Sequence, residues 1–306
     1  MTKTIKIGTR SSELAVYQAN LVSSILMRNG YKTEIITIDS EGDINLIQPI
    51  YKVGFSGVFT KTLDIALLNN KIDIAVHSLK DVPTNLPENI KNLAVLKREV
   101  ATDILKYKGD IINFDDTLTV GTGSIRRKAQ WLNKYPHHHV EGLRGNVNTR
   151  LKKINENEHW FGAIFAKAGL KRINLLGENY INLDWMIPAP AQGAIVVASR
   201  IDDTYIDEIR PFLNDIDSEI TTSVERDFMN GIQAGCSSPI GAIATINENK
   251  LYFKGLIISI DGKNKQLIKR EIPLEKVDGF GAHCADETIY LYGDLVRKIK
   301  LDLSKL

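Results

Sequence analysis

Short apolar runs alternate with segments of helical spacing over the first two-thirds of the chain. Residues 5–8, 33–38 and 72–76 read as strands, and residues 13–29 and 59–69 between them place apolar side chains on one helical face. The same order then repeats, with strands and helices predicted in turn at 118–121, 125–134, 138–141, 147–155, 162–165 and 168–176. This alternation predicts α/β layers with largely parallel sheets.

The pattern changes at three places along the chain. A polar stretch at 97–103 separates the two α/β halves, and a Pro-rich crossover at 187–193 leads into a strand at 194–198 that can return to the first half. Beyond residue 217 a helix precedes three alternating strands and a closing helix, predicted at 218–229, 240–246, 251–260, 266–272 and 281–299. We therefore predict two doubly wound α/β lobes plus a smaller α+β C-terminal domain with a mostly antiparallel sheet. The predicted domains are 1–97 with 194–214, 98–193, and 217–306.

Composition indicates an ordinary globular protein. The chain has 306 residues, of which 43% are hydrophobic and 25% charged, and this length suits two or three domains. A net charge of only +2 and the lack of a helix-turn-helix pattern argue against a nucleic-acid partner. We expect no membrane span, because no apolar run approaches the roughly 20 residues required. The start lacks a signal-peptide pattern and two cysteines are too few for a disulfide scaffold, so we expect a cytoplasmic protein.

Three turns rich in Gly, Ser and Thr carry the candidate chemistry. They lie at residues 8–12, 121–127 and 143–150, and each places arginines just after an apolar run. Small residues let a backbone approach a ligand closely, and the arginine fork matches carboxylate or phosphate. The carboxyl ends of strands in an α/β sheet are where ligands bind. Several such turns predict a substrate with several negative groups.

Eight segments together resemble one known family. They are GTRSSELAVYQ (8–18), GVFTKTLDIALL (57–68), DIAVHSLKDVP (73–83), VGTGSIRRKAQ (120–130), LRGNVNTRL (143–151), AKAGLKR (166–172), PAPAQGA (188–194) and AGCSSPIGA (234–242). In their order and spacing the chain closely resembles the porphobilinogen deaminases, also called hydroxymethylbilane synthases, along essentially its whole length.

The resemblance implies an activity that suits the arginine turns. Such enzymes join four porphobilinogen molecules head to tail with loss of ammonia, giving the linear tetrapyrrole hydroxymethylbilane. They use a dipyrromethane cofactor held by a thioether to one cysteine, and relatives are generally monomeric. Each pyrrole carries an acetate and a propionate, and arginine binds carboxylates bidentately. The cations would thus hold a flexible polyanionic chain in register.

Two residues are assigned to the chemistry through the resemblance. Cys236, in a turn of small residues, is the expected site of cofactor attachment; from the turn alone, a buried inert cysteine is equally plausible. Cys284 has no such support and is expected to pack in the core. Asp81 is the expected catalytic acid and base, which would protonate the leaving amine and stabilise the pyrrole nitrogens. Without the resemblance, an aspartate before Val82-Pro83 is more often a turn or cap residue.

The remaining expected site residues bind cofactor and substrate. The family's arginines correspond to Arg10, Arg126, Arg127, Arg144, Arg150 and Arg172, with Lys80 beside the catalytic position, and its hydroxyl ligands to Ser12, Ser78, Thr122 and Ser124. Taken alone, Arg150 and Arg172 could lie on solvated helix faces, and Lys171 could replace Arg172 in facing the ligand. Thr102, where many relatives carry arginine, and Ala191, where they commonly carry glycine, depart from the pattern.

Other features have structural explanations. The run 137–139 consists of three histidines, but neighbouring strand residues face opposite sides and no further ligand has suitable spacing, so we predict a strand edge and no metal. The stretch 41–58 is predicted to be a mobile lid, with Phe55 either stacking on a pyrrole or anchoring the loop. The competing function is a non-catalytic two-lobed anion or solute-binding protein, since two such lobes also resemble periplasmic binding proteins.

Overall fold

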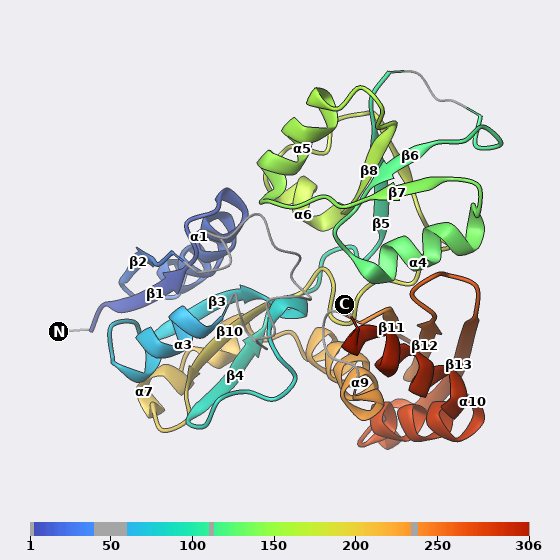
Figure 1. Ribbon diagram of the computed structural model, residues 1–306. Coiled ribbons are helices and arrows are strands. Elements are labelled where there is room, and N and C mark those ends of the chain that lie inside the picture. Colours follow the sequence, from blue (N-terminus) through green and yellow to red (C-terminus); the bar gives the residue numbers. More distant parts are fainter. Residues whose placement is uncertain (1–2, 40–59, 110–112, 234–237, 306) are drawn as a thin grey trace. The chain divides into compact units, whose positions relative to one another are not determined.

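The computed structural model describes residues 3–39, 60–109, 113–233 and 238–305 (Figure 1). The chain divides into two compact units. The first is built from described residues of 1–46, 55–99 and 193–220, and the second from those of 100–192 and 221–306. The predicted lid at 41–58 and Cys236 lie outside the described residues.

A five-stranded mixed sheet forms the centre of the first unit. Its order is β2-β1-β3-β10-β4, in which β1 runs parallel to β2 and β3 while β10 is antiparallel to β3 and β4. The strand predicted at 194–198 therefore does return to the first sheet, as β10. The strands are β1 Ile5–Thr9, β2 Thr33–Thr37, β3 Ile74–Ser78, β4 Ile90–Val95 and β10 Ile195–Arg200.

Helices cover both faces of this sheet. Ala19, Val22 and Leu26 of α1 (Glu13–Arg28) pack on one face, against Ile5 and Ile7 among others. On the opposite face, α3 (Lys61–Leu68) packs Leu63, Ala66 and Leu67 against Ile72 and Ala75. Short helices α7 (Thr204–Asp207) and α8 (Arg210–Leu213) follow β10. Apolar residues on both sheet faces explain why β3 reads as a continuous apolar run.

The second unit contains another doubly wound sheet, of order β7-β6-β8-β5-β9. Strands β6, β7 and β8 are parallel, whereas β5 is antiparallel to β8 and β9. Trp131 of α4 packs on one face and Leu170 of α6 on the other. The elements are β5 Asp103–Tyr107, β6 Thr119–Gly121, α4 Ile125–Lys134, β7 His139–Glu141, α5 Val147–Glu156, β8 Gly162–Ala166, α6 Lys167–Arg172 and β9 Tyr180–Asn182.

An antiparallel sheet and two long helices complete the second unit. Strands β11 (Ile240–Asn247), β12 (Lys250–Ile258) and β13 (Lys265–Pro273) form the sheet. Along the chain the sheet follows α9 (Ile216–Ile232), whose residues 216–220 belong to the first unit, and precedes α10 (Phe280–Ser304). The fold class predicted from the sequence is thereby confirmed. Ala129 of α4 packs against Leu256 and Ile258 of β12, which joins the two sheets of this unit. No helix in the described part of the chain is both long and apolar enough to cross a membrane.

Candidate active site

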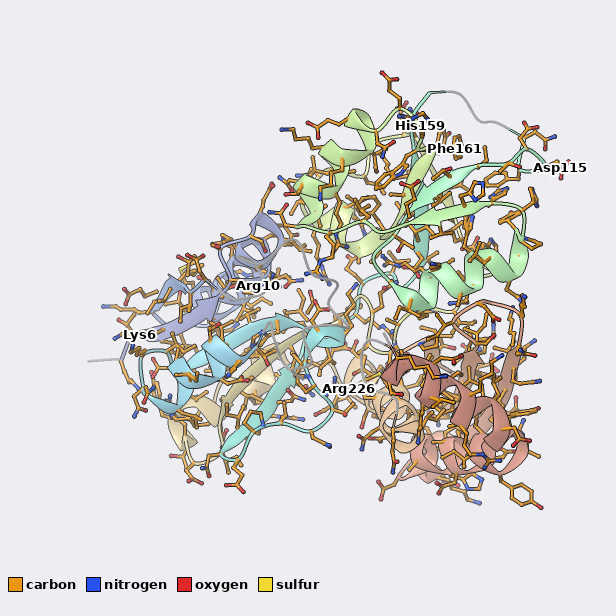
Figure 2. The ribbon with its side chains drawn as sticks, viewed as in Figure 1. Lys6, Arg10, Asp115, His159, Phe161 and Arg226 are labelled. Carbon is orange, nitrogen blue, oxygen red and sulfur yellow. The ribbon has the colours of Figure 1, made fainter. Side chains whose placement is uncertain are left out.

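The first arginine turn begins where β1 ends. Figure 2 labels Arg10, which directly follows this strand. Because Gly8 lies opposite Ala75 in the parallel pairing of β1 and β3, Arg10 and Ser78 lie at the same edge of the sheet. A Cβ on Gly8 would lie 2.2 Å from Ile72 Cδ1, so a larger residue here would force the Ile72 side chain to move. Ser12 is the N-cap residue of α1, so it lies at the same edge.

The segment after β3 holds Asp81 towards solvent. It forms a short 3₁₀ turn, Leu79–Asp81, in which Leu79 and Val82 are each only 2% exposed while Asp81 is exposed. The Leu79 amide donates to the carbonyl oxygen of Ala194, the residue before β10, at 3.0 Å, and the Val82 amide donates to Leu79 O at 3.2 Å. Two buried anchors thus fix an outward-facing carboxylate.

Ser78 and its neighbour on the strand face opposite sides of the sheet. The Ser78 hydroxyl accepts a hydrogen bond from Gln18 Nε2 on α1 at 2.8 Å. His77 points to the other face and is 6% exposed, and its Nε2 atom is buried with no hydrogen-bond partner among the described residues. Burial, and secondarily the charge of Arg10, lower the pKa of His77 to about 4. The imidazole is therefore neutral at physiological pH.

The second arginine turn connects β6 to α4. Ser124 is the N-cap of α4, where its hydroxyl accepts from the Arg127 amide at 3.4 Å, and its own amide donates to Thr122 Oγ1 at 3.2 Å. Both predicted hydroxyl ligands therefore also stabilise the turn. A Cβ on Gly123 would lie 2.5 Å from Leu143 O, so only glycine lets this turn pack against the third arginine turn.

The two arginines of this turn are buried and bound to protein groups. Arg126 and Arg127 are 4% and 6% exposed, and both form ion pairs of 2.8 Å with Asp103, which is fully buried. Burial opposes ionisation of Asp103, but the charges of the two arginines outweigh it and hold the pKa at about 2. Gln192 adds a hydrogen bond of 2.8 Å to the same carboxylate. The predicted role of the arginine pair in binding ligand carboxylates stays a prediction.

The third turn is built around a glycine in the left-handed region. Gly145 has φ +116°, and its carbonyl accepts from Arg150 Nε at 2.7 Å. Asn146 caps α5 by accepting from the Thr149 amide at 2.9 Å. Burial lowers the pKa of Arg144. Arg150 is half-buried, so its side chain lies along the turn and not on a fully solvated helix face.

Arg172 also differs from a solvated helix residue. It lies at the end of α6 and is 8% exposed, whereas Lys171 is exposed. The helix predicted for 168–176 ends at Arg172, and Asn174 follows with φ +55°. The alternative that Arg172 lies on a solvated helix face is therefore wrong. That Arg172 binds a carboxylate of the ligand stays a prediction.

Of the two cysteines, Cys284 lies among the described residues. Cys236 lies outside the described residues, although Ser238 just beyond it is 4% exposed and β11 begins two residues later. Cys284 is fully buried, and burial together with Glu287 raises the pKa of its thiol to about 12. The thiol is therefore unreactive at neutral pH, and the prediction that Cys284 packs in the core is confirmed.

The histidine run lies beside an aromatic cluster. β7, which starts at His139, is an edge strand, as predicted. His138 is 3% exposed, stacks on Tyr135 with ring centroids 4.8 Å apart, and accepts from Trp131 Nε1 at 3.2 Å. In the part of the chain that the structure describes, no three His, Cys, Asp or Glu residues are grouped to hold a metal ion.

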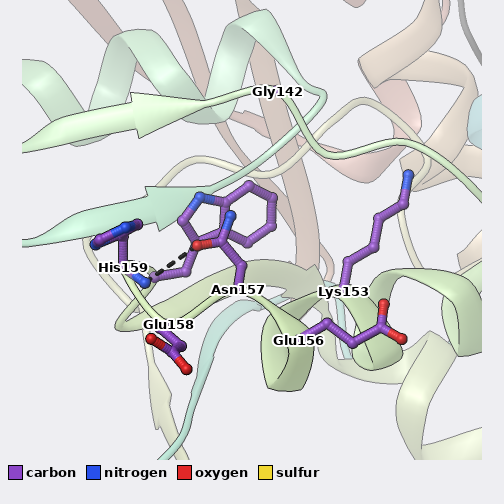
Figure 3. Close-up of a pocket in the computed structure, with 7 residues that line it drawn as sticks. Gly142, Lys153, Glu156, Asn157, Glu158 and His159 are labelled. Carbon is purple, nitrogen blue, oxygen red and sulfur yellow. Dashed lines mark hydrogen bonds between the residues drawn. The ribbon is translucent and has the colours of Figure 1, made fainter.

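A surface cavity of about 550 Å³ lies elsewhere in the second unit (Figure 3). It is lined by Gly142, Lys153, Glu156, Asn157, Glu158, His159 and Trp160. None of the residues predicted for the site lines it. Its two glutamates are also unsuited to a substrate rich in carboxylates.

Sequence reasoning missed three buried polar residues that organise the candidate site. Asp103 and Gln192 hold the arginine pair, and Gln18 binds Ser78. Asp103 had a usable signal: it is an acidic residue directly before the apolar pair Ile104-Leu105. A charge at the start of a buried strand needs an oppositely charged partner, and in the structure Arg126 and Arg127 are those partners.

Two doubly wound α/β sheets with arginine-bearing turns at strand ends, and an additional antiparallel sheet, define the fold class of this protein. Two family descriptions match this chain: "Porphobilinogen deaminase, dipyromethane cofactor binding domain" at residues 5–208 and "Porphobilinogen deaminase, C-terminal domain" at 220–289. The chain therefore belongs to the porphobilinogen deaminase family, and it is an enzyme of the transferase class. The alternative of a non-catalytic solute-binding protein is not favoured.

Individual relatives agree with the family descriptions over most of their length. The "Probable porphobilinogen deaminase" of Methanocaldococcus jannaschii is 44% identical over 265 residues, which cover 84% of this chain and 89% of that protein. The "Porphobilinogen deaminase" of Campylobacter hominis is 38% identical and covers 93% and 94%. That of Carboxydothermus hydrogenoformans is 36% identical and covers 94% of both chains.

Proposed function

We propose that this chain joins four porphobilinogen molecules head to tail, with release of ammonia, to give hydroxymethylbilane. The cofactor is dipyrromethane, bound through a thioether to Cys236, and it supplies the end to which substrate units are added. The donor set fits a group of this kind, because its carboxylates need cations and hydroxyls at strand ends. Such groups are present in Arg10, Ser12, Ser78, Lys80, Thr122, Ser124, Arg126, Arg127, Arg144, Arg150 and Arg172.

Asp81 is the proposed general acid and base. Its carboxylate protonates the leaving amine of porphobilinogen, stabilises positive charge on the pyrrole nitrogens, and helps to remove the α-proton after coupling. The observation that carries this assignment is the turn Leu79–Asp81, which exposes one carboxylate between two buried anchors. A residue so held can approach a substrate without the backbone moving.

The test is ammonia release from porphobilinogen by the purified protein and by Asp81→Ala. The wild type should release ammonia, and the variant should be slower by at least about 10², the lower end of the contribution from general acid–base catalysis. Glu34→Ala, which removes another exposed carboxylate of the first unit outside the predicted site, is the control and should retain turnover. Near-normal turnover in Asp81→Ala would remove the assignment, and no ammonia from the wild type would remove the function.

We further propose that the protein acts as a cytoplasmic monomer and binds no nucleic acid. The free, buried thiol of Cys284 and a sequence with only two cysteines suit a reducing compartment. A net charge of +2 offers little general attraction for nucleic acid. Light scattering after size-exclusion chromatography should give a mass near that of one chain, and twice that mass would contradict the monomer.

A further inference from the structure

One buried carboxylate organises both arginines of the second turn. Asp103 is the first residue of β5, and its exposed fraction is 0%. Its Oδ2 accepts from Arg126 Nη2 at 2.8 Å, and its Oδ1 accepts from Arg127 Nε at 3.1 Å and Nη2 at 2.8 Å. One carboxylate thus ties two guanidinium groups to the strand.

The direction of that carboxylate is itself fixed. The backbone of Asp103 pairs with Ala166 in the sheet, and its carbonyl accepts from the Leu183 amide at 2.9 Å. Gln192 donates from Nε2 to Asp103 Oδ1 at 2.8 Å and to Ala101 O at 2.6 Å. Because the backbone and the side chain of Asp103 are both held, its ion pairs fix Arg126 and Arg127 relative to β5.

The charges in this cluster do not cancel. Two guanidinium groups face one carboxylate, so a net charge of +1 is buried at the start of α4, where the helix dipole adds partial positive charge. A buried excess charge is costly unless an opposite charge completes it. A ligand carboxylate would supply the missing charge.

The two arginines also differ in the donors that they have left. Arginine has five N–H donors. Arg127 uses four of them, towards Asp103, Ile164 O at 3.0 Å and Gln192 Oε1 at 3.4 Å. Arg126 uses two within the described residues, towards Asp103 and towards Ile187 O at 2.5 Å. Arg127 thus has one N–H donor left for a ligand within the described residues, and Arg126 has three.

We propose that Asp103 is a positioning residue that holds Arg126 at the start of α4 to bind a carboxylate of the pyrrole chain. The inference rests on the proposed function, because the ligand is the carboxylate-bearing cofactor or its extended form. Asp103 touches no substrate itself. It acts through the orientation of Arg126, with Arg127 and Gln192 completing the frame.

A double-mutant cycle tests this role. The cycle compares the wild type with Asp103→Asn, Arg126→Leu and the double variant. A separate variant, Phe253→Leu, changes the core of the three-stranded sheet and is the control for lost stability. Intact-protein mass gives the fraction of folded protein that carries dipyrromethane, and thermal unfolding gives the folded fraction. Kinetic assays then separate KM from kcat.

Asp103→Asn should lower the loaded fraction or raise KM by about ten-fold or more, as expected for the loss of one charge-assisted hydrogen bond. Phe253→Leu should stay loaded when equally folded. Adding Arg126→Leu to Asp103→Asn should change loading little further, since both act through one contact. Independent, multiplying effects of the two changes would overturn the proposal, as would full loading of Asp103→Asn.

Asp103→Glu provides a second route if the asparagine variant does not fold. It keeps the negative charge but moves the guanidinium groups by one methylene, so it should also load poorly. Loading and KM at wild-type levels in Asp103→Glu would overturn the positioning role. A wild-type protein that carries no adduct and releases no ammonia would instead refute the proposed function, so the two failures are distinguishable.

Discussion

The neutral histidine next to the turn that carries Asp81, the proposed catalytic residue, should make the first unit sensitive to mild acid. His77 is 6% exposed, and burial followed by the charge of Arg10 lowers its pKa from 6.5 to about 4. The folded state therefore binds a proton less readily than the unfolded state. Its contribution to stability is fully present above pH 6.5 and is lost as the pH falls towards 4.

The size of the effect follows from the two pKa values. Over the full interval the loss is about 3 kcal/mol, because one pKa unit corresponds to about 1.4 kcal/mol. Between pH 7 and pH 5 the linkage relation gives a loss of about 2 kcal/mol in the free energy of unfolding. Carboxylates titrate mainly below this range, so the histidine should dominate the slope there.

Amide hydrogen exchange can measure this loss of stability in the first unit. Peptides that contain β3 should exchange faster at pH 5 than at pH 7 after correction for intrinsic rates, and His77→Gln should remove most of the difference. His139→Gln, at an exposed position, is the matched control and should behave as the wild type. All three tryptophans, Trp131, Trp160 and Trp185, lie in the second unit, so their fluorescence reports it separately. An unchanged pH dependence in His77→Gln would refute the reasoning.

Two further variants test packing in the second unit. Gly123→Ala places a Cβ 2.5 Å from a backbone oxygen of the neighbouring arginine turn, so it should cost about 1–3 kcal/mol in urea unfolding, whereas Gly142→Ala meets open space and should be neutral. Equal stability of the two would contradict the close approach. Glu225→Gln should cost about 1–3 kcal/mol, since the buried carboxylate accepts from the Ala191 and Ala244 amides, both at 2.7 Å, and an amide group serves only one of them. Unchanged exchange protection of both amides would show that these bonds do not matter.

The apolar pattern was sufficient to predict most of the helices and strands. It predicted β1, β3 and β6 because each is a short apolar run that ends at Gly, Ser or Thr, and α1 and α4 because their apolar residues recur at helical spacing. It did not predict the strands at 90–95 and 103–107, where charged residues interrupt the apolar positions, or the strand at 180–182, which is only three residues long. These strands form because their neighbours in the sheet supply backbone partners, which periodicity does not reveal.

The candidate site was predicted by residue type more than by environment. The resemblance indicated the arginines of the second turn, but only the structure shows that Asp103 occupies both of them. Their burial depends on a strand 23 residues away in sequence, so no local pattern contains it. Ala191 is a second case: it has φ +60°, a backbone conformation that glycine adopts more readily than alanine. Glu225 stabilises that turn through the Ala191 amide.

The central claim is that this chain carries and extends a pyrrole chain on the sulfur of Cys236. Intact-protein mass spectrometry before and after porphobilinogen tests it most directly. We expect the purified protein to carry one dipyrromethane adduct, to gain further pyrrole units in steps when substrate is added, and to lose the adduct in Cys236→Ser while Cys284→Ser retains it. A wild-type mass equal to that of the bare chain, unchanged by substrate, would contradict the account.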